Sequence, residues 1–459
     1  MSPMKIIRGR RVITERGLEP ASLHVRAGRI EAVAAYDEAP AGSPIVDAGD
    51  AVVLPGIVDS HVHVNEPGRT DWEGFSAATR AAAAGGITTL VDMPLNAIPP
   101  TTTVEGLRQK RHAAAPQCYV DTAFWGGVVP DNESEIEPLL REGVCGFKCF
   151  TIDSGVEEFP PVTVDHMRRA LEILAPTGAP LLVHAEHPEP IAAAEAAARG
   201  KTGAENAIHA DDPREFRAFL ATRPARAELR AIELLAELAA ETGGRVHIVH
   251  LAAADAVELL DRARASGARI SAETCPHYLT LAAEDIPRGA TEYKCAPPIR
   301  ERENRDRLWQ SLGRGGIDMV VSDHSPCPPA LKELKSGNFL CAWGGISSVQ
   351  LSLPVTWTEA QARGYGLEAL ARWMSAAPAK LAGLSTKGAL APGYDADVVF
   401  FDPDATSQVE PSALYHRHPI TPYARRALRG AVQKTFLRGE IIYDRGQVVA
   451  EPSGQIIRP

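Results

Sequence analysis

Five residues with metal-binding side chains stand at the ends of four separate apolar runs. They are His61, His63, His184, His250 and Asp323. Residues i and i+2 of a strand point to the same side, so His61 and His63 can bind one cation. Imidazoles together with a carboxylate suit zinc or another divalent first-row metal. Each residue alone is as well explained by a core position, but their shared placement predicts a metal site.

A lysine in a fifth apolar run has surroundings that disfavour an ordinary ammonium group. Lys148 lies between Phe147 and Phe150 on a segment expected to be a buried strand, where an unpaired ammonium is costly. A protonated lysine cannot bind a metal, whereas the carbamate formed with CO₂ is an anion whose two oxygens can bridge two metal ions. The alternative is a surface or salt-bridged lysine, and the pattern by itself leaves both open.

Short apolar runs alternate with longer Ala-, Glu- and Arg-rich stretches of helical period through the middle of the chain. The eight runs are residues 51–59, 87–93, 119–129, 144–150, 180–186, 245–251, 269–275 and 317–324. The helix candidates include residues 73–84, 103–114, 163–175, 226–241, 253–266 and 300–312. Eight buried strands, each followed by a helix, predict an α/β fold of the (β/α)₈ TIM-barrel type, with functional side chains at the carboxyl ends of the strands. An open doubly wound sheet is the alternative, because periodicity does not show closure.

The two ends of the chain have a different, strand-rich pattern. Residues 3–53 and two stretches after residue 388 contain short strand candidates separated by turn signals. Chain termini often lie close together, so we expect both ends to form one small β-sandwich domain, residues 1–53 with residues 388–459. The barrel domain is then expected over residues 54–387.

The overall composition disfavours several classes of protein. The 459 residues carry a net charge of −10, which argues against a nucleic-acid binder. Seven cysteines without a CxxC pair argue against a disulfide framework and a thiolate zinc site. The longest uncharged stretch, residues 336–358, contains Pro354 and many polar residues, so we expect no membrane-spanning helix. The N-terminus lacks the pattern of a signal peptide, and the expected location is the cytoplasm.

With these residues in place, the sequence resembles the amidohydrolase superfamily, in its branch of cyclic amidases. The resemblance covers nearly the whole chain and includes Lys387-Gly388 and Pro392-Gly393-Tyr394-Asp395-Ala396-Asp397-Val398, at the return to the small domain. It implies two divalent metal ions, zinc first, with iron, cobalt or manganese as alternatives. It also implies the ligands: His61, His63 and Asp323 for one metal, His184 and His250 for the other, and Lys148 as a bridging N6-carboxylysine formed with CO₂.

Within that branch the sequence resembles the allantoinases most. The likeness is carried by residues 59–75, by residues 146–160 and by Ala342-Trp343-Gly344-Gly345-Ile346-Ser347-Ser348. Asn65 stands where dihydroorotases place an arginine for the substrate carboxylate, and Asp153 stands where hydantoinases place a tyrosine that donates to the oxyanion. The resemblance therefore implies a neutral cyclic ureide as substrate, allantoin, which is hydrolysed to allantoate.

The same resemblance implies roles for further residues around the metal site. Asp323 takes a proton from the water that the metals activate and passes it to the leaving nitrogen; the alternative is that it is a ligand only. Substrate contacts are expected from loops that follow the strands, each with a loop-shaping role as the alternative. They are Asn65, Arg69, Asn96, Ala296, Trp343 and Gly344. We expect His277 and His324 beside the ligands, and His247 on the opposite side of its strand from His250.

Two other functions stay open. One is a hydantoinase or dihydropyrimidinase, against which Asp153 and residues 154–160 argue. The other is a non-catalytic structural or signalling protein on the same fold, which disagrees with the complete set of ligands. Relatives in this branch are commonly tetramers. We therefore expect a homotetramer that binds a small-molecule substrate, with no nucleic-acid or membrane partner.

Overall fold

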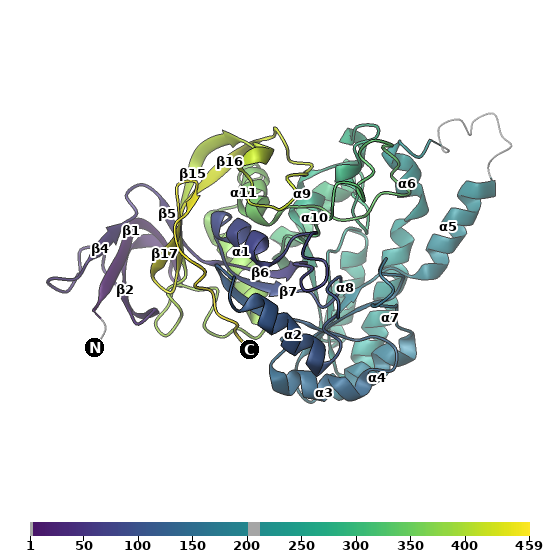
Figure 1. Ribbon diagram of the computed structural model, residues 1–459, viewed down its shortest axis with the longest axis horizontal. Helices are drawn as coiled ribbons and strands as arrows, with labels where there is room; N and C mark the ends of the chain where they lie inside the picture. The colour runs from purple at the N-terminus through teal and green to yellow at the C-terminus, as the bar shows by residue number, and fades with distance from the viewer. Residues whose placement is uncertain (1–2, 201–211) are drawn as a thin grey trace.

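Figure 1 shows the computed structural model of the chain, which describes residues 3–200 and 212–459. A β layer lies at one side, next to a larger α/β part built from the middle of the chain. Residues 1–2 of the expected β domain and residues 201–211 of the expected barrel lie outside the described ranges.

The β layer is a nine-stranded sheet made from both ends of the chain. Its strands are β1 (Lys5–Thr14), β2 (Gly17–Arg26), β3 (Arg29–Ala34), β4 (Ile45–Asp47), β5 (Val52–Pro55), β15 (Val398–Gln408), β16 (Ala427–Leu437), β17 (Glu440–Asp444) and β18 (Gln447–Val448). Their order is β18-β17-β16-β15-β5-β1-β2-β3, with β4 paired to β1. The two halves join where β5 runs antiparallel to β15, with Val53 opposite Phe400. Both side chains are buried in one small core. The sheet thus unites the two chain ends, while the boundaries at residues 53 and 388 stay predictions.

The barrel strands are short, parallel and largely buried. They are β6 (Ile57–Val62), β7 (Ile87–Asp92), β8 (Asp121–Phe124), β9 (Gly126–Gly127), β10 (Phe147–Phe150), β11 (Pro180–His184), β12 (Arg245–Ile248), β13 (Ile270–Thr274) and β14 (Met319–Val320). Strand β8 leads through Trp125 into β9, and the neighbouring strands from β6 to β8 and from β9 to β14 pair in parallel. Every predicted apolar run therefore overlaps a barrel strand, although residues 51–59 contain β5 of the β layer and only the start of β6.

The barrel closes between its first and last strands. Val62 at the end of β6 pairs in parallel with His324 after β14. The N–H of His63 donates to the carbonyl of His324 at 2.9 Å. The Asp59 carboxylate adds a link by accepting from the N–H of Ser322 at 3.2 Å. This closure excludes the open doubly wound sheet and confirms the predicted (β/α)₈ barrel.

Helices surround the barrel and follow its strands in turn. They are α1 (Phe75–Ala84), α2 (Val104–Ala114), α3 (Glu133–Glu142), α4 (Val164–Leu174), α5 (Pro188–Gly200), α6 (Phe216–Thr222), α7 (Ala225–Thr242), α8 (Ala256–Ala265), α9 (Pro276–Thr280), α10 (Arg302–Gly313), α11 (Ser352–Ala362), α12 (Leu367–Ala371) and α13 (Ala377–Leu381). A side-chain cap fixes the start of α4: the Thr163 hydroxyl accepts from the N–H of His166, whose Nδ1 accepts in return from the Thr163 N–H at 3.1 Å. Within residues 3–200 and 212–459, no helix is both long and apolar enough to cross a bilayer.

The end of the chain returns to the barrel at β8. Thr122 pairs with β7 on one side and with Ile456 on the other. Its N–H donates to the carbonyl of Gln455 at 2.9 Å, and its carbonyl accepts from the N–H of Ile457 at 3.0 Å. A Cβ at Gly454 would lie 2.1 Å from the Val120 carbonyl oxygen, so only glycine permits this approach.

Candidate metal centre and active-site pocket

Three of the residues expected to bind metal converge where the barrel closes. His61 lies on β6, His63 directly follows that strand, and Asp323 follows β14. The Oδ1 atom of Asp323 lies 3.2 Å from Nε2 of His61 and 3.5 Å from Nε2 of His63. Asp323 has a φ of 44°, a backbone conformation that residues other than glycine rarely adopt and that is enriched at functional sites. Two imidazole nitrogens thus face one carboxylate oxygen.

The other two histidines meet beside this group. His184 ends β11 and His250 follows β12. Nδ1 of His184 lies 3.1 Å from Nε2 of His250. The ring centres of His250 and His61 are 5.4 Å apart, and all of these side chains are buried. The barrel thus gathers side chains from four strands into one cluster.

Two buried carboxylates bind the histidine rings through their second nitrogens. Glu273 of β13 accepts from Nδ1 of His61 at 2.5 Å, and Glu186 accepts from Nε2 of His184 at 2.8 Å. The nitrogen that donates to the carboxylate carries the proton, so the other nitrogen of each ring offers its lone pair to a metal. Sequence reasoning missed both glutamates, whose signal is an acidic residue at the end of an apolar run.

The expectation that His247 faces away from the cluster is wrong. Its Nε2 lies 3.1 Å from Oε2 of Glu273, in the same buried network as His61. Strand alternation does not extend from His247 to His250, because β12 ends at Ile248 and His250 has a φ of 39°. His247 therefore supports the carboxylate that orients His61.

Lys148 on β10 is fully buried, and no described residue forms an ion pair with it. Its Nζ makes no hydrogen bond to any residue within 3–200 and 212–459. The same atom lies 4.1 Å from the centre of the Phe150 ring. Burial lowers the pKa of Lys148 from 10.5 to about 8, which favours the neutral amine. The structure therefore argues against the alternative of a surface or salt-bridged lysine.

Burial also keeps His63, His184 and His250 uncharged. It lowers the pKa of His63 to about 4 and the pKa values of His184 and His250 well below 6.5. Neutral imidazoles have free lone pairs. Together with the Asp323 carboxylate and the unpartnered Lys148 amine, they form a donor set that fits divalent first-row metals. The cluster is therefore a candidate metal centre.

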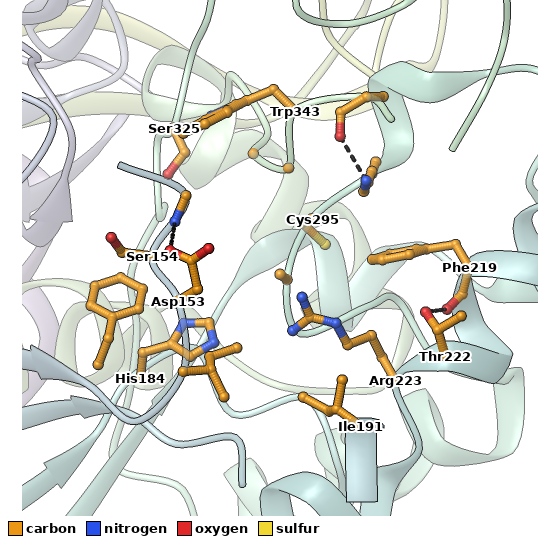
Figure 2. Close-up of a pocket in the computed structure, with 18 of the residues that line it drawn as sticks. Asp153, Ser154, His184, Ile191, Phe219, Thr222, Arg223, Cys295, Ser325 and Trp343 are labelled. Atoms are coloured by element: carbon orange, nitrogen blue, oxygen red, sulfur yellow. Dashed lines mark hydrogen bonds between the residues drawn. The ribbon is translucent and has the colours of Figure 1, made fainter. Parts of the chain in front are cut away.

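This cluster forms part of the wall of a pocket of about 1130 Å³. Figure 2 shows His184 and Asp153 on one side of it, with Phe219 and Thr222 of α6 and the following Arg223 on the other. Residues 340–345, in the loop after β14, form a further wall. The pocket thus lies at the carboxyl ends of the barrel strands, where active sites of this fold occur.

Four of the six residues expected to contact substrate line this pocket. They are Asn96, Ala296, Trp343 and Gly344. Asn65 and Arg69 are not among the described residues that line it. Arg69 instead forms an ion pair with Glu158 and donates to the Asn96 carbonyl at 2.7 Å, so it joins the loops after β6, β7 and β10. A substrate contact from Asn65 or Arg69 stays a prediction.

His277 and His324 lie in different places. His277 groups with Cys275 and Asp323, with possible ligand atoms within 4.8 Å of one another. The His324 ring instead accepts from the N–H of Ser348 at 3.0 Å and lies 3.4 Å from the Glu73 carboxylate. His277 therefore lies beside the metal ligands, whereas the main chain of His324 takes part in closing the barrel.

Two basic side chains of the pocket were not identified from the sequence. Arg223, directly after α6, donates to Glu186 at 2.8 Å. Lys294 donates to the carbonyl of Ala342 at 2.6 Å. The sequence carries one usable signal, because Lys294 stands two residues before Ala296, in a loop already expected at the site.

Comparisons with known proteins agree with this architecture. The model of the Amidohydrolase family matches residues 52–442. The chain is 51% identical to the allantoinase of Streptomyces avermitilis over 98% of both chains, and 46% identical to the allantoinase of Saccharomyces cerevisiae over 88% of this chain and 86% of the relative. Among solved structures, the L-hydantoinase (dihydropyrimidinase) from Arthrobacter aurescens superposes with a TM-score of 0.93, at 31% identity over the whole of both chains. This chain therefore belongs to the amidohydrolase family.

Proposed function

We propose that this protein is a metal-dependent allantoinase, which hydrolyses the ring amide of allantoin to allantoate. The observation that carries the proposal is a pocket with buried, uncharged histidines beside Asp323 in its wall. We propose allantoin as the substrate because the chain is 51% identical to an allantoinase over 98% of its length. Asn65 in place of an arginine also agrees with a substrate that carries no carboxylate.

The ligands that we propose for two divalent metal ions follow the geometry of the cluster. His61, His63 and Asp323 would hold one ion, since both histidine Nε2 atoms face the Asp323 carboxylate. His184 and His250 would hold the other, because their facing nitrogens lie 3.1 Å apart. We propose zinc, with iron, cobalt or manganese as alternatives, since the same ligands suit all four.

We further propose that Lys148 reacts with CO₂ and bridges the two ions as N6-carboxylysine. Its amine is buried, and its pKa of about 8 leaves part of it neutral and able to attack CO₂ at neutral pH. The Nζ atom of Lys148 is buried and has no hydrogen-bond partner in the described ranges. As a carbamate, the side chain would instead carry a negative charge that the metal ions balance.

Asp323 would also move the proton during hydrolysis. The reaction adds the water oxygen to the ring carbonyl carbon and breaks the ring C–N bond. Asp323 accepts the water proton and delivers it to the leaving nitrogen, while the Ser325 hydroxyl, which donates to Oδ1 at 2.9 Å, holds the carboxylate in place. When bound, the metal ions supply an activated water and polarise the carbonyl.

Turnover of allantoin by the metal-loaded protein, with bicarbonate present, tests the proposal. We expect allantoate to form, and removal of metal by a chelator to abolish the reaction. The Asp323→Asn variant with metal still bound is expected to lose at least about 100-fold in kcat, since general acid–base catalysis contributes that much. Absence of turnover with two metals bound would reject allantoin as substrate.

A hydantoinase activity is the second candidate, favoured by the TM-score of 0.93 to an L-hydantoinase. Assays with 5-substituted hydantoins and dihydrouracil, run beside allantoin, separate the two functions. A hydantoin hydrolysed faster than allantoin would replace the first proposal by the second.

A further inference from the structure

The pocket has a basic end that the metal chemistry does not use. Arg223 and Lys294 line it together with the apolar side chains of Ile191 and Phe219, and the acidic Glu195 lines the same pocket. Figure 2 shows the Arg223 guanidinium reaching into the pocket between His184 and Phe219. A single ureide ring occupies far less than 1130 Å³, so a substituent on a ring held at the metals would extend into the remaining space.

Lys294 is a buried ammonium without a carboxylate partner in the described parts of the chain. Lys294 is 8% exposed, and its Nζ donates to the carbonyls of Ala342 at 2.6 Å and Leu340 at 3.3 Å. The Phe219 ring centre lies 4.7 Å from Nζ. An ammonium has three N–H donors. Two are used by these carbonyls, and one remains for a ligand in the pocket.

Arg223 is held in place but keeps free donors. One Nη1 hydrogen bond goes to Glu186, at 2.8 Å, and no other side-chain hydrogen bond of Arg223 occurs within residues 3–200 and 212–459. Its side chain is 22% exposed. Burial chiefly, with a smaller contribution from the charge of Arg223, lowers the pKa of Lys294 to about 8. Both cations line the pocket and offer N–H groups to a ligand inside it.

We infer that Lys294, assisted by Arg223, is the specificity-determining residue that binds the carbonyl oxygen of the substrate's ureido tail. This inference rests on the proposed function and names the part of the substrate that this end of the pocket selects. A urea carbonyl is a strong neutral acceptor and satisfies the free N–H groups. An alkyl or aryl tail would exclude water from these N–H groups without offering them an acceptor. The lost hydrogen bonds cost more free energy than the new apolar contacts gain. The same pair of residues thus favours a ureido tail and rejects an apolar one.

Lys332 provides a matched control, because it supports the same loop from outside the pocket. Its Nζ donates to the carbonyls of Trp343, at 3.1 Å, and Gly345. Lys332 is 3% exposed and is not among the described lining residues. If Lys294 acted only by holding residues 340–345, then Lys294→Met and Lys332→Met would affect every substrate alike.

The experiment compares kcat/KM for allantoin and for 5-propylhydantoin, whose tail is apolar. We expect Lys294→Met to lower the value for allantoin by about 10- to 100-fold while leaving the value for 5-propylhydantoin unchanged or higher. Lys332→Met is expected to lower both values by one common factor. An equal loss on both substrates in Lys294→Met would overturn the inference and leave the proposed function intact.

The wild-type protein supplies a second measurement that needs no variant to fold. 5-Propylhydantoin is expected to inhibit allantoin hydrolysis with an inhibition constant at least about tenfold above the KM for allantoin. An apolar tail that binds as tightly as the ureido tail would overturn the inference. Wild-type protein that hydrolyses 5-propylhydantoin but not allantoin would overturn both the inference and the proposed function.

Discussion

Two histidines of this site, His61 and His184, depend on carboxylates that bind their second nitrogens. Glu273 accepts from His61 and from His247, and Glu186 accepts from His184 and from Arg223. Each carboxylate fixes the tautomer of its histidine and makes the free nitrogen a better donor to a metal. Glu186 also links the metal centre to the pocket, because Arg223 lines that pocket. The chemistry therefore rests on more residues than the ligands themselves.

Replacing Glu273 by glutamine tests this dependence. Glutamine keeps the shape but loses the negative charge that makes His61 a strong ligand, so metal affinity is expected to fall about 10- to 100-fold. Chelator competition followed by elemental analysis measures it. Glu228→Gln is the control, since Glu228 is equally buried but pairs with Arg300 rather than with a histidine. Equal metal affinities of Glu273→Gln and the wild type would contradict this role.

The buried Lys148 amine predicts how carbamylation depends on pH. CO₂ reacts with the neutral amine, and burial lowers the pKa of Lys148 to about 8. At a fixed concentration of dissolved CO₂, the rate in metal-free protein should rise about tenfold per pH unit below pH 8 and level off above it. The carbamate signal from ¹³C-labelled CO₂ follows the reaction. A rate that still rises between pH 9 and 10 would show that the amine keeps its ordinary pKa.

At the scale of the elements, a buried ion cluster joins the barrel to the β layer. Lys387 lies before β15 and donates to Asp121 of β8 at 2.6 Å and to Asp397 at 2.7 Å. Asp395 lies 3.0 Å from the same Nζ. Although burial opposes the charge, these carboxylates, Asp397 first, raise the pKa of Lys387 above its ordinary value. The lysine thus neutralises acidic groups from two parts of the fold.

Removing that lysine should destabilise the protein. Lys387→Met leaves Asp397 and Asp395 without this cation, while Asp121 keeps only its ion pair with Arg438, and we expect a loss of about 3–5 kcal/mol in the free energy of unfolding. Lys434→Met is the control, because its ion pair with Asp444 is partly exposed and should be worth less than about 1 kcal/mol. Chemical denaturation of both variants measures the difference. Equal midpoints would show that the buried cluster does not stabilise the junction.

At the scale of the whole molecule, the chain closes on itself twice. The first closure is the barrel, where Val62 meets His324. The second brings Ile456 to Thr122, more than 300 residues earlier in the chain, beside the strand that carries Asp121. The C-terminal segment is therefore part of the barrel rather than of the β layer alone.

Deleting residues 453–459 tests this second closure. The deletion removes the main-chain partners of Thr122 and of the Cys118 carbonyl, which accepts from Gly454 at 2.9 Å. Buried groups left without partners cost about 1–3 kcal/mol each, so a loss of several kcal/mol is expected. Deletion of Pro459 alone keeps these bonds and should leave stability unchanged. An unaltered denaturation midpoint in the longer deletion would contradict a structural role for the segment.

The sequence by itself determined eight buried strands that alternate with helices, and the residue types of the candidate metal centre. These follow from local rules: two-residue alternation, helical period, and the carboxyl ends of parallel strands at one edge. Only the tertiary structure decided barrel closure, the carboxylates behind the histidines, the direction of His247 and the basic end of the pocket. These depend on contacts between residues distant in the chain, such as Glu273 with His61 and Lys294 with Ala342. Local periodicity carries no information about such contacts, because only the packing of the folded chain brings these side chains together.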